Sequence, residues 1–285
     1  MKIDRRALKA RAREAMRRTS PSFWAVALLY LLLTTGVQSA LSLLASVLPG
    51  GSSWVFLNVL FFLYSMVLQF GLRLWALWAW RGLDPGAGSL IQGFSIPGRV
   101  VMMELLILLR ILGWTIGFAI LLSPFLMLLT ASPVLYWIAL GAVSVLLTIV
   151  TLRYSMAPYL LADRPDDGAS LAIRRSVAMM HRRAWELFKL QLSFLGWQLI
   201  NWALSTGVFL FLCAQAGLFQ APAGMESLLL YQSVSGSLAN VALSGLVTLP
   251  LSLWLLPYQE VAQAGFYEEV RQTGPAPGAP EMPPL

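Results

Sequence analysis

The sequence is poor in charged residues, cysteine and histidine. Asp, Glu, Lys and Arg make up only 12% of the 285 residues and 58% are hydrophobic, which leaves too little polar surface for a soluble globule of this size. The single cysteine, Cys213, excludes a disulfide within the chain. The single histidine, His181, stands beside two arginines without neighbouring metal ligands. We therefore expect a membrane protein with no metal site and no cofactor.

Catalytic motifs are missing as well. No paired histidines or cysteines, phosphate-binding glycine loop or Gly-x-Ser-x-Gly turn occurs in a suitable context. The net charge of +7 would suit nucleic acid only if the bases gathered in one soluble domain among stacking aromatics, and they flank apolar segments instead. We therefore expect neither an enzyme nor a nucleic-acid-binding protein, and no catalytic residues.

The sequence does contain a series of long apolar segments. A helix needs about 20 apolar residues to cross a bilayer core about 30 Å thick. Only Ser132-Pro133 separates the third and fourth segments, but 99–162 is too long for one crossing, so we expect a tight hairpin there. The pattern predicts an all-α, polytopic transmembrane helical bundle with six spans, near 22–48, 54–81, 99–130, 133–162, 184–212 and 236–267.

The first 21 residues are basic. We expect 1–21 to form an interfacial helix on anionic headgroups, with Arg17 and Arg18 at the membrane interface. A cleaved signal peptide is the alternative, but its apolar part spans only about 7 to 15 residues. Phe23 to Leu48 stays apolar almost throughout, so a retained first span fits better. The narrow apolar face of the basic helix consists of Ile3, Ala7 and Ala10.

An acidic turn and a short basic helix connect the fourth and fifth spans. We expect the carboxylates of the turn to complement the exposed N–H groups at the start of the helix, 170–183. This amphipathic helix should lie at the cytoplasmic-side interface, either as a gate or docking element or, as its pattern favours, as a connector held by lipid headgroups. The turn carries Asp163, Asp166 and Asp167, the apolar face Ile173, Val177 and Met180, and the other faces Arg174, Arg175, Arg182 and Arg183.

Charged residues inside the predicted spans are the candidate site. An unpaired arginine at the bilayer centre costs about 2.5 to 3.5 kcal/mol on insertion scales, so these groups should face the bundle interior and meet one another. Arg110 lies eleven residues beyond Arg99, about 16 Å along a helix, which puts it near mid-membrane. Glu104 lies about 240° away around that helix, so we expect it to pair with Arg73 or Arg153 instead. The ligand-binding candidates are Arg110, Glu104, Arg73, Arg153 and Glu260.

The balance of these charges suggests two functions. Three arginines against two carboxylates leave one positive charge, which an anionic headgroup or solute would balance. Snorkelling of Arg73 and Arg153 toward the interface is the alternative. We expect a protein that handles or senses an anionic lipid or solute through interior arginines, or else a non-catalytic scaffold or accessory subunit of a larger membrane complex. The expected partners are membrane lipids with anionic headgroups, and a membrane protein or a second copy of the chain.

Three stretches of the second half carry a family resemblance: RYSMAPYLLADRPD, AWELFKLQLSFLGWQLI and LWLLPYQEVAQAGFYEEV. Together with the basic first helix, Phe23-Trp24 and Gln92-Gly93-Phe94, they resemble the bacterial integral membrane family catalogued as domain of unknown function 975. The chain departs from the family in a long loop at 213–235 and an extended third span. The resemblance implies a multi-spanning protein of the bacterial inner membrane. Because the family has no established activity, it supplies no catalytic residues.

The basic residues also predict the orientation. The loops at 49–53, 131–132 and 213–235 contain no Lys or Arg, which places them outside and both termini in the cytoplasm. Many prolines and the lack of an apolar period predict that the end of the chain is disordered. The expected organisation is a basic helix at 1–21, a transmembrane domain at 22–270 and a disordered tail at 271–285.

Labelling of introduced thiols tests this orientation. In a cysteine-free background, Ser52→Cys and Gln232→Cys should react with a membrane-impermeant reagent from the outer side only, because both lie in loops without basic residues. Modification of either position from the cytoplasmic side alone would overturn the predicted topology.

Overall fold

The computed structural model describes residues 4–47, 51–125, 132–220 and 224–273, and every regular element in these ranges is a helix. In chain order the elements are α1 (Arg5–Arg17), α2 (Phe23–Leu31), the π-helix η1 (Leu32–Gly36), α3 (Val37–Val47), α4 (Gly51–Arg81), η2 (Ala87–Ser95), α5 (Pro97–Leu122), η3 (Ser123–Phe125), α7 (Pro133–Leu152), α8 (Ala157–Asp163), η4 (Pro165–Asp167), α9 (Gly168–Met179), α10 (Ala184–Leu192), α11 (Leu195–Gln215), α12 (Met225–Ser235) and α13 (Leu238–Thr273).

Six helical stretches are long and apolar enough to cross a membrane, which confirms the all-α, multi-pass architecture: Phe23–Ser42, Trp54–Arg81, Pro97–Phe125, Val134–Asp163, Leu195–Gln215 and Leu238–Thr273. The predicted start of the fifth span was too early, because α10 ends before Ser193 and the apolar helix starts only at Leu195. The sixth span runs on to Thr273, so 271–273 are helical, and 274–285 lie outside the described residues.

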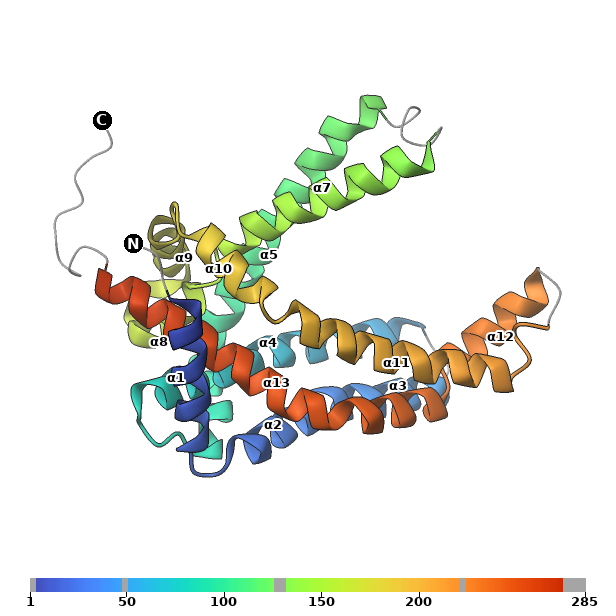
Figure 1. The fold of residues 1–285 in the computed structure, drawn as a ribbon, viewed down its shortest axis with the longest axis horizontal. Coiled ribbons are helices and arrows are strands. Elements are labelled where there is room, and N and C mark those ends of the chain that lie inside the picture. The colour runs from blue at the N-terminus through green and yellow to red at the C-terminus, as the bar shows by residue number, and fades with distance from the viewer. Residues whose placement is uncertain (1–3, 48–50, 126–131, 221–223, 274–285) are drawn as a thin grey trace.

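The spans form two groups that meet at one end (Figure 1). The first group consists of α2 with α3, α4, α11 and α13, and the second is the hairpin of α5 and α7, which leaves the first at an angle. Helices α1, α8, α9 and α10 gather where the groups meet, which we call the basal end. The opposite end of the first group, near α12, is the distal end.

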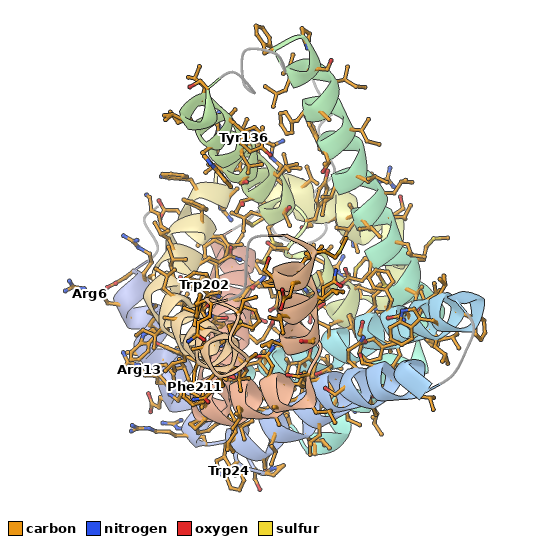
Figure 2. All side chains as sticks on the ribbon, turned by 90° about the vertical axis from the view of Figure 1, so that its right-hand side faces the viewer. Arg6, Arg13, Trp24, Tyr136, Trp202 and Phe211 are labelled. Carbon is orange, nitrogen blue, oxygen red and sulfur yellow. The ribbon has the colours of Figure 1, made fainter. Side chains whose placement is uncertain are left out.

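Both groups expose large apolar side chains. Trp202 and Phe211 of α11 are 68% and 59% exposed, and Tyr136 of α7 is 43% exposed. Figure 2 shows all three standing outward from their helices. A soluble protein rarely exposes apolar patches of this extent, whereas lipid covers them in a membrane. The exposed surface therefore agrees with a bundle surrounded by lipid.

Helix α1 packs on the basal end of the bundle. Leu8, Ala12 and Met16 recur at four-residue spacing and are buried in the packing against α4 and α13. Ala7 and Ala10, expected on the apolar face, are exposed, so that part of the prediction was wrong. The reason is that Leu and Met remove more apolar surface than alanine does, so their face is the one that packs.

A basic side chain connects α1 to the bundle. Lys9 Nζ donates to the Ser193 carbonyl at 3.1 Å, at the bend between α10 and α11. Burial, with the nearby charges of Arg13 and Arg5, lowers the pKa of Lys9. This contact connects the first helix to the start of the fifth span.

Helix α9 also rests on protein. Ile173 is fully buried in a cluster with Val100 and Met103 of α5, and α9 packs against both α5 and α8. Contact of Ile173 with lipid, as predicted from the sequence, is therefore wrong. An apolar stripe shows that a face is covered, but the stripe looks the same whether lipid or protein covers it.

The aspartates of the acidic turn bind arginines rather than helix N–H groups. Asp167 precedes α9 but makes no side-chain cap, and it pairs with Arg175 instead. Asp166 lies 3.2 Å from Arg99 Nη1. The predicted capping role was wrong at both positions, because a guanidinium offers each carboxylate a full positive charge, whereas a helix N–H group offers only a partial one.

Glycines allow close approach to α4 on two sides. A Cβ atom on Gly71 would lie 2.0 Å from the carbonyl oxygen of Leu90 in η2, and one on Gly265 of α13 would lie 2.6 Å from the Trp80 ring. Any larger residue would displace backbone or a buried ring. These contacts fix η2 and α13 against α4, which carries Arg73.

Candidate functional site

Three helices that run in the same direction, α4, α8 and α13, bring polar residues into two layers. Arg73 and Arg81 on α4 are eight residues apart, as are Glu260 and Glu268 on α13, and this spacing is about 12 Å along a helix. Tyr159 and Asp163 on α8 are four residues apart. The layer toward the distal end, with Glu104 of α5, is the interior cluster: Arg73, Glu104, Tyr159 and Glu260. The layer at the basal end is the basal network: Arg81, Asp163, Tyr267, Glu268 and Arg271.

An ion pair between α4 and α5 forms one side of the interior cluster. Arg73 Nη1 donates to Glu104 Oε1 at 2.9 Å, and the two side chains are only 20% and 16% exposed. Of the two partners predicted for Glu104, Arg73 and Arg153, the structure shows Arg73. This pair joins the first group of helices to the hairpin through a charge-assisted hydrogen bond, which is stronger than a neutral one.

The other side of the cluster contains polar atoms without partners. Glu260 lies close enough to Arg73 and to Tyr159 for their charges to interact. Glu260 Oε2 and Tyr159 Oη are nevertheless buried without a hydrogen-bond partner in the part of the chain that the structure describes. The two groups lie near each other, but their geometry falls short of a hydrogen bond. Unsatisfied groups in a buried site indicate a place where water, a proton or a ligand binds.

The charge of this cluster has the opposite sign from the expected one. The structure brings together one arginine, Arg73, and two carboxylates, Glu104 and Glu260. Full ionisation would leave one negative charge rather than one positive charge. The cluster itself therefore does not favour an anion.

Two of the predicted arginines lie elsewhere, and their placement in the cluster was wrong. Arg153 is exposed, because α7 ends at Leu152 and helical spacing no longer sets the direction of the next side chain. Arg110 is half-buried, with its guanidinium carbon 5.9 Å from the centroid of the Tyr154 ring. Among the described residues, no carboxylate lies within 4.0 Å of it.

The basal network was not predicted. Arg81 Nη2 lies 2.7 Å from Asp163 Oδ1 and 2.5 Å from Glu268 Oε1. Arg271 Nη1 and Tyr267 Oη both donate to Asp163 Oδ2, at 2.7 and 2.6 Å. Two arginines thus neutralise two carboxylates where α4, α8 and α13 end. The sequence does contain one indication of this network. An arginine follows Arg73 by eight residues on α4, and a glutamate follows Glu260 by eight residues on α13.

A cavity with a partly polar wall lies on the distal side of the interior cluster. Its volume is about 600 Å³, and it lies between the first span, α4 and the junction of α12 with α13. On α4, Phe61, Ser65 and Gln69 line it at four-residue spacing, and Arg73 follows one turn further on. The hydroxyl and amide side chains that line it are Thr34, Thr35, Gln38, Ser39, Ser42, Ser65 and Gln69.

The first span is irregular at this cavity. The π-helix η1 interrupts it between α2 and α3, and such turns are frequent at functional sites. Thr34, Ser39 and Ser42 donate their hydroxyl hydrogens to carbonyls of their own span at 2.8, 2.8 and 2.9 Å. Their oxygens still accept hydrogen bonds, and Gln38 and Gln69 add amide donors, so the wall can both accept from and donate to a ligand.

The arginines predicted at the membrane interface fall into two sets. Arg17, Arg18, Arg174 and Arg182 are exposed, and contact of these with headgroups stays a prediction. Arg175 pairs with Asp167, and Arg183 Nη1 donates to the Val270 carbonyl at 3.0 Å, so both are bound to protein. Within the described ranges, no three His, Cys, Asp or Glu side chains are grouped as metal ligands.

The comparisons with known proteins give one match. A family model described as protein of unknown function (DUF975) matches residues 1–274, which includes every helix of both polar layers and the cavity. No curated protein and no solved structure matches the chain.

The buried ion pair predicts a non-additive effect on stability. Arg73→Leu should lower the free energy of unfolding by about 3 to 5 kcal/mol, because it leaves Glu104 charged and unpaired. Adding Glu104→Leu should recover most of that loss, since both charges are then gone. Denaturation in detergent measures both effects, with Arg153→Leu as the matched control at an exposed arginine. A double variant no more stable than Arg73→Leu would contradict the pairing.

Proposed function

The chain belongs to the DUF975 family of proteins of unknown function, and we propose that it is a multi-pass membrane protein that binds a small polar molecule inside the bilayer. The observation that carries this proposal is the cavity of about 600 Å³ whose described lining includes seven serine, threonine and glutamine side chains. Its size lies within the range of about 300 to 1,000 Å³ that small-molecule sites occupy.

A lipid chain alone would leave the polar side chains of this cavity without partners. Polar groups that face hydrocarbon without partners are costly, and each amide of Gln38 and Gln69 carries two donors as well as an acceptor. The serine and threonine hydroxyls reduce that cost by donating to their own helix. The amides gain most from water or from a solute that offers hydroxyl, carbonyl or amide groups.

The lining also narrows the chemistry of the ligand. The described residues of the cavity wall include no Asp, Glu, Lys or Arg. An uncharged polar solute, or an uncharged polar part of a larger one, therefore matches it best, and the aromatic side chains Tyr30 and Phe61 offer faces for apolar carbon. Arg73 of the interior cluster follows Gln69 one turn further along α4.

We propose a carrier or sensor rather than an enzyme. Serine and threonine hydroxyls become nucleophiles when a base activates them. His181, the only histidine of the chain, lies in the turn between α9 and α10 at the basal end. The proposed location is the bacterial inner membrane with both termini in the cytoplasm, on the strength of the loops that lack Lys and Arg.

A second candidate function is the binding of an anionic lipid or solute by interior arginines. Arg110 supports it, because this half-buried guanidinium contacts Tyr154 and no described carboxylate. The exposed arginines of α1 and α9 supply further positive charge at the basal end. A scaffold role, with another membrane protein or a second copy as partner, would use the exposed apolar faces of the hairpin.

Solute screening tests the proposed function. In detergent, at least one uncharged polar solute (a polyol, a sugar or an amide) should raise the melting temperature of the wild-type protein, because a ligand that binds only the folded state stabilises it. The same solute should have no effect on Gln69→Leu, which removes an amide from the wall. Ser144→Ala is the matched control, because Ser144 lies on α7 outside the cavity.

A second experiment tests whether water reaches the cavity. In a cysteine-free background, Ser39→Cys should react with a hydrophilic thiol reagent. If this position stays unmodified in the folded protein while the same thiol reacts after denaturation, the cavity is dry and the proposal is wrong.

A further inference from the structure

We propose that Glu260 is a proton-binding site at the base of the polar cavity, and that its protonation is linked to occupancy of the cavity. The first part stands on the interior cluster alone. The second part deepens the proposed function and rests on it.

The cluster lies directly beyond the cavity wall. Gln69, which lines the cavity, and Arg73 share one face of α4 and are one turn apart. Tyr30 lines the cavity from the first span and lies close enough to Glu260 and Arg73 for their charges to act on it. A ligand or water at the inner end of the cavity is therefore separated from Glu260 by single side chains.

The geometry favours a proton over other occupants. Arg73 is already bound by Glu104 at 2.9 Å, while Glu260 Oε2 has no donor among the described residues. A buried carboxylate that lacks a full partner is costly, and taking up a proton removes the charge. The resulting O–H group becomes a donor, and the buried Tyr159 oxygen beside it is an acceptor. Protonation thus removes the buried charge of Glu260 without requiring a second guanidinium.

A metal ion or an anion fits this place less well. The described residues supply no set of three metal-ligating side chains here. An anion would meet two carboxylates and only one arginine, which is already paired.

The charged and titratable side chains around Glu260 come from several of the surrounding helices. The only positive charge in the cluster is Arg73, and it is shared with Glu104. The sequence of α11 contains no Asp, Glu, Lys, Arg or His. The titratable groups around Glu260 are Arg73 from α4, Tyr159 from α8, Tyr30 from α2 and Glu104 from α5. On α1, Arg11 and Arg13 lie over the Trp80 and Tyr258 rings, at 4.6 and 5.9 Å from the ring centroids. On α10, Glu186 and Lys189 pair with each other.

The basal side of the site is closed. The Tyr159 ring stacks on the Tyr267 ring with centroids 5.3 Å apart, and Tyr267 donates to Asp163 at 2.6 Å within the basal network. Arg81 and Arg271 neutralise the carboxylates there. The cavity is therefore the side from which we expect protons to reach Glu260.

Labelling with a hydrophobic carbodiimide tests the proton site without any ligand. The reagent adds to a protonated carboxyl and leaves a stable N-acylurea, which peptide mass spectrometry locates. In the wild-type protein, labelling of Glu260 should fall several-fold between about pH 5 and about pH 9, the range that covers ordinary and buried glutamates. Glu104 and Glu268, each bound to an arginine, are the internal controls and should stay unlabelled.

A second measurement covers the case in which the reagent does not reach the site. The pH dependence of the melting temperature should differ between the wild-type protein and Glu260→Gln, because only the wild type exchanges a proton there. Glu226→Gln, in α12, serves as the control and should follow the wild type. Labelling independent of pH, or no labelling together with identical melting profiles, would overturn the proton site. If Glu260→Gln does not fold, the labelling of the wild type decides.

The link to the cavity has its own readout. A solute that raises the melting temperature in the screen should also change the rate of Glu260 labelling several-fold at fixed pH, and should leave it unchanged in Gln69→Leu. A proton site without this effect would overturn only the linkage, whereas a screen without any stabilising solute would count against the proposed function and leave the proton site standing.

Discussion

The arrangement of the polar interior depends on the ion pair between Arg73 and Glu104. It joins α4 of the first group to α5 of the hairpin, and it is buried on both sides. Once Arg73 is committed to Glu104, no second guanidinium is left for Glu260, whose Oε2 has no partner among the described residues. In a bilayer such a group is expensive unless it changes its protonation state or meets a ligand. The polar cavity one turn away supplies the nearest route by which either could arrive.

The two polar layers differ in how many of their polar groups have partners. In the basal network each carboxylate faces an arginine, and Tyr267 completes the set. In the interior cluster one carboxylate and one hydroxyl are unsatisfied. The open layer lies toward the cavity and the distal end, and the satisfied layer lies where α4, α8 and α13 end. This contrast agrees with a binding site that is closed at the basal end. The eight-residue spacing on α4 and α13 places the two layers one above the other along the same helices.

The sequence predicted the features that depend on local chemistry. Long apolar runs identified six spans, and depth from the same side of the membrane limited the predicted partners of Glu104 to Arg73 and Arg153, of which the structure shows Arg73. Faces of helices were predicted less well. The apolar stripe of α9 was correctly recognised, but the stripe does not show whether lipid or the hairpin helix α5 covers it. Arg153 was misplaced because helical periodicity ends with α7, one residue before it.

Features that need several helices could not be predicted. The basal network joins residues more than 80 positions apart in the sequence. Taken singly, these residues look like ordinary charged residues at the ends of membrane spans. The cavity is built from serine, threonine and glutamine, which occur singly in many spans and satisfy themselves on their own helix. Only their assembly around one space, at a π-helix, distinguishes them.

The most direct test of whether the cavity binds a polar molecule is an experimental density map of the protein in lipid nanodiscs. The account predicts ordered water or solute between Gln69 and Tyr30, within hydrogen-bonding distance of the cavity wall and continuing toward Glu260. An acyl chain filling that space, or side chains repacked to close it, would contradict the account.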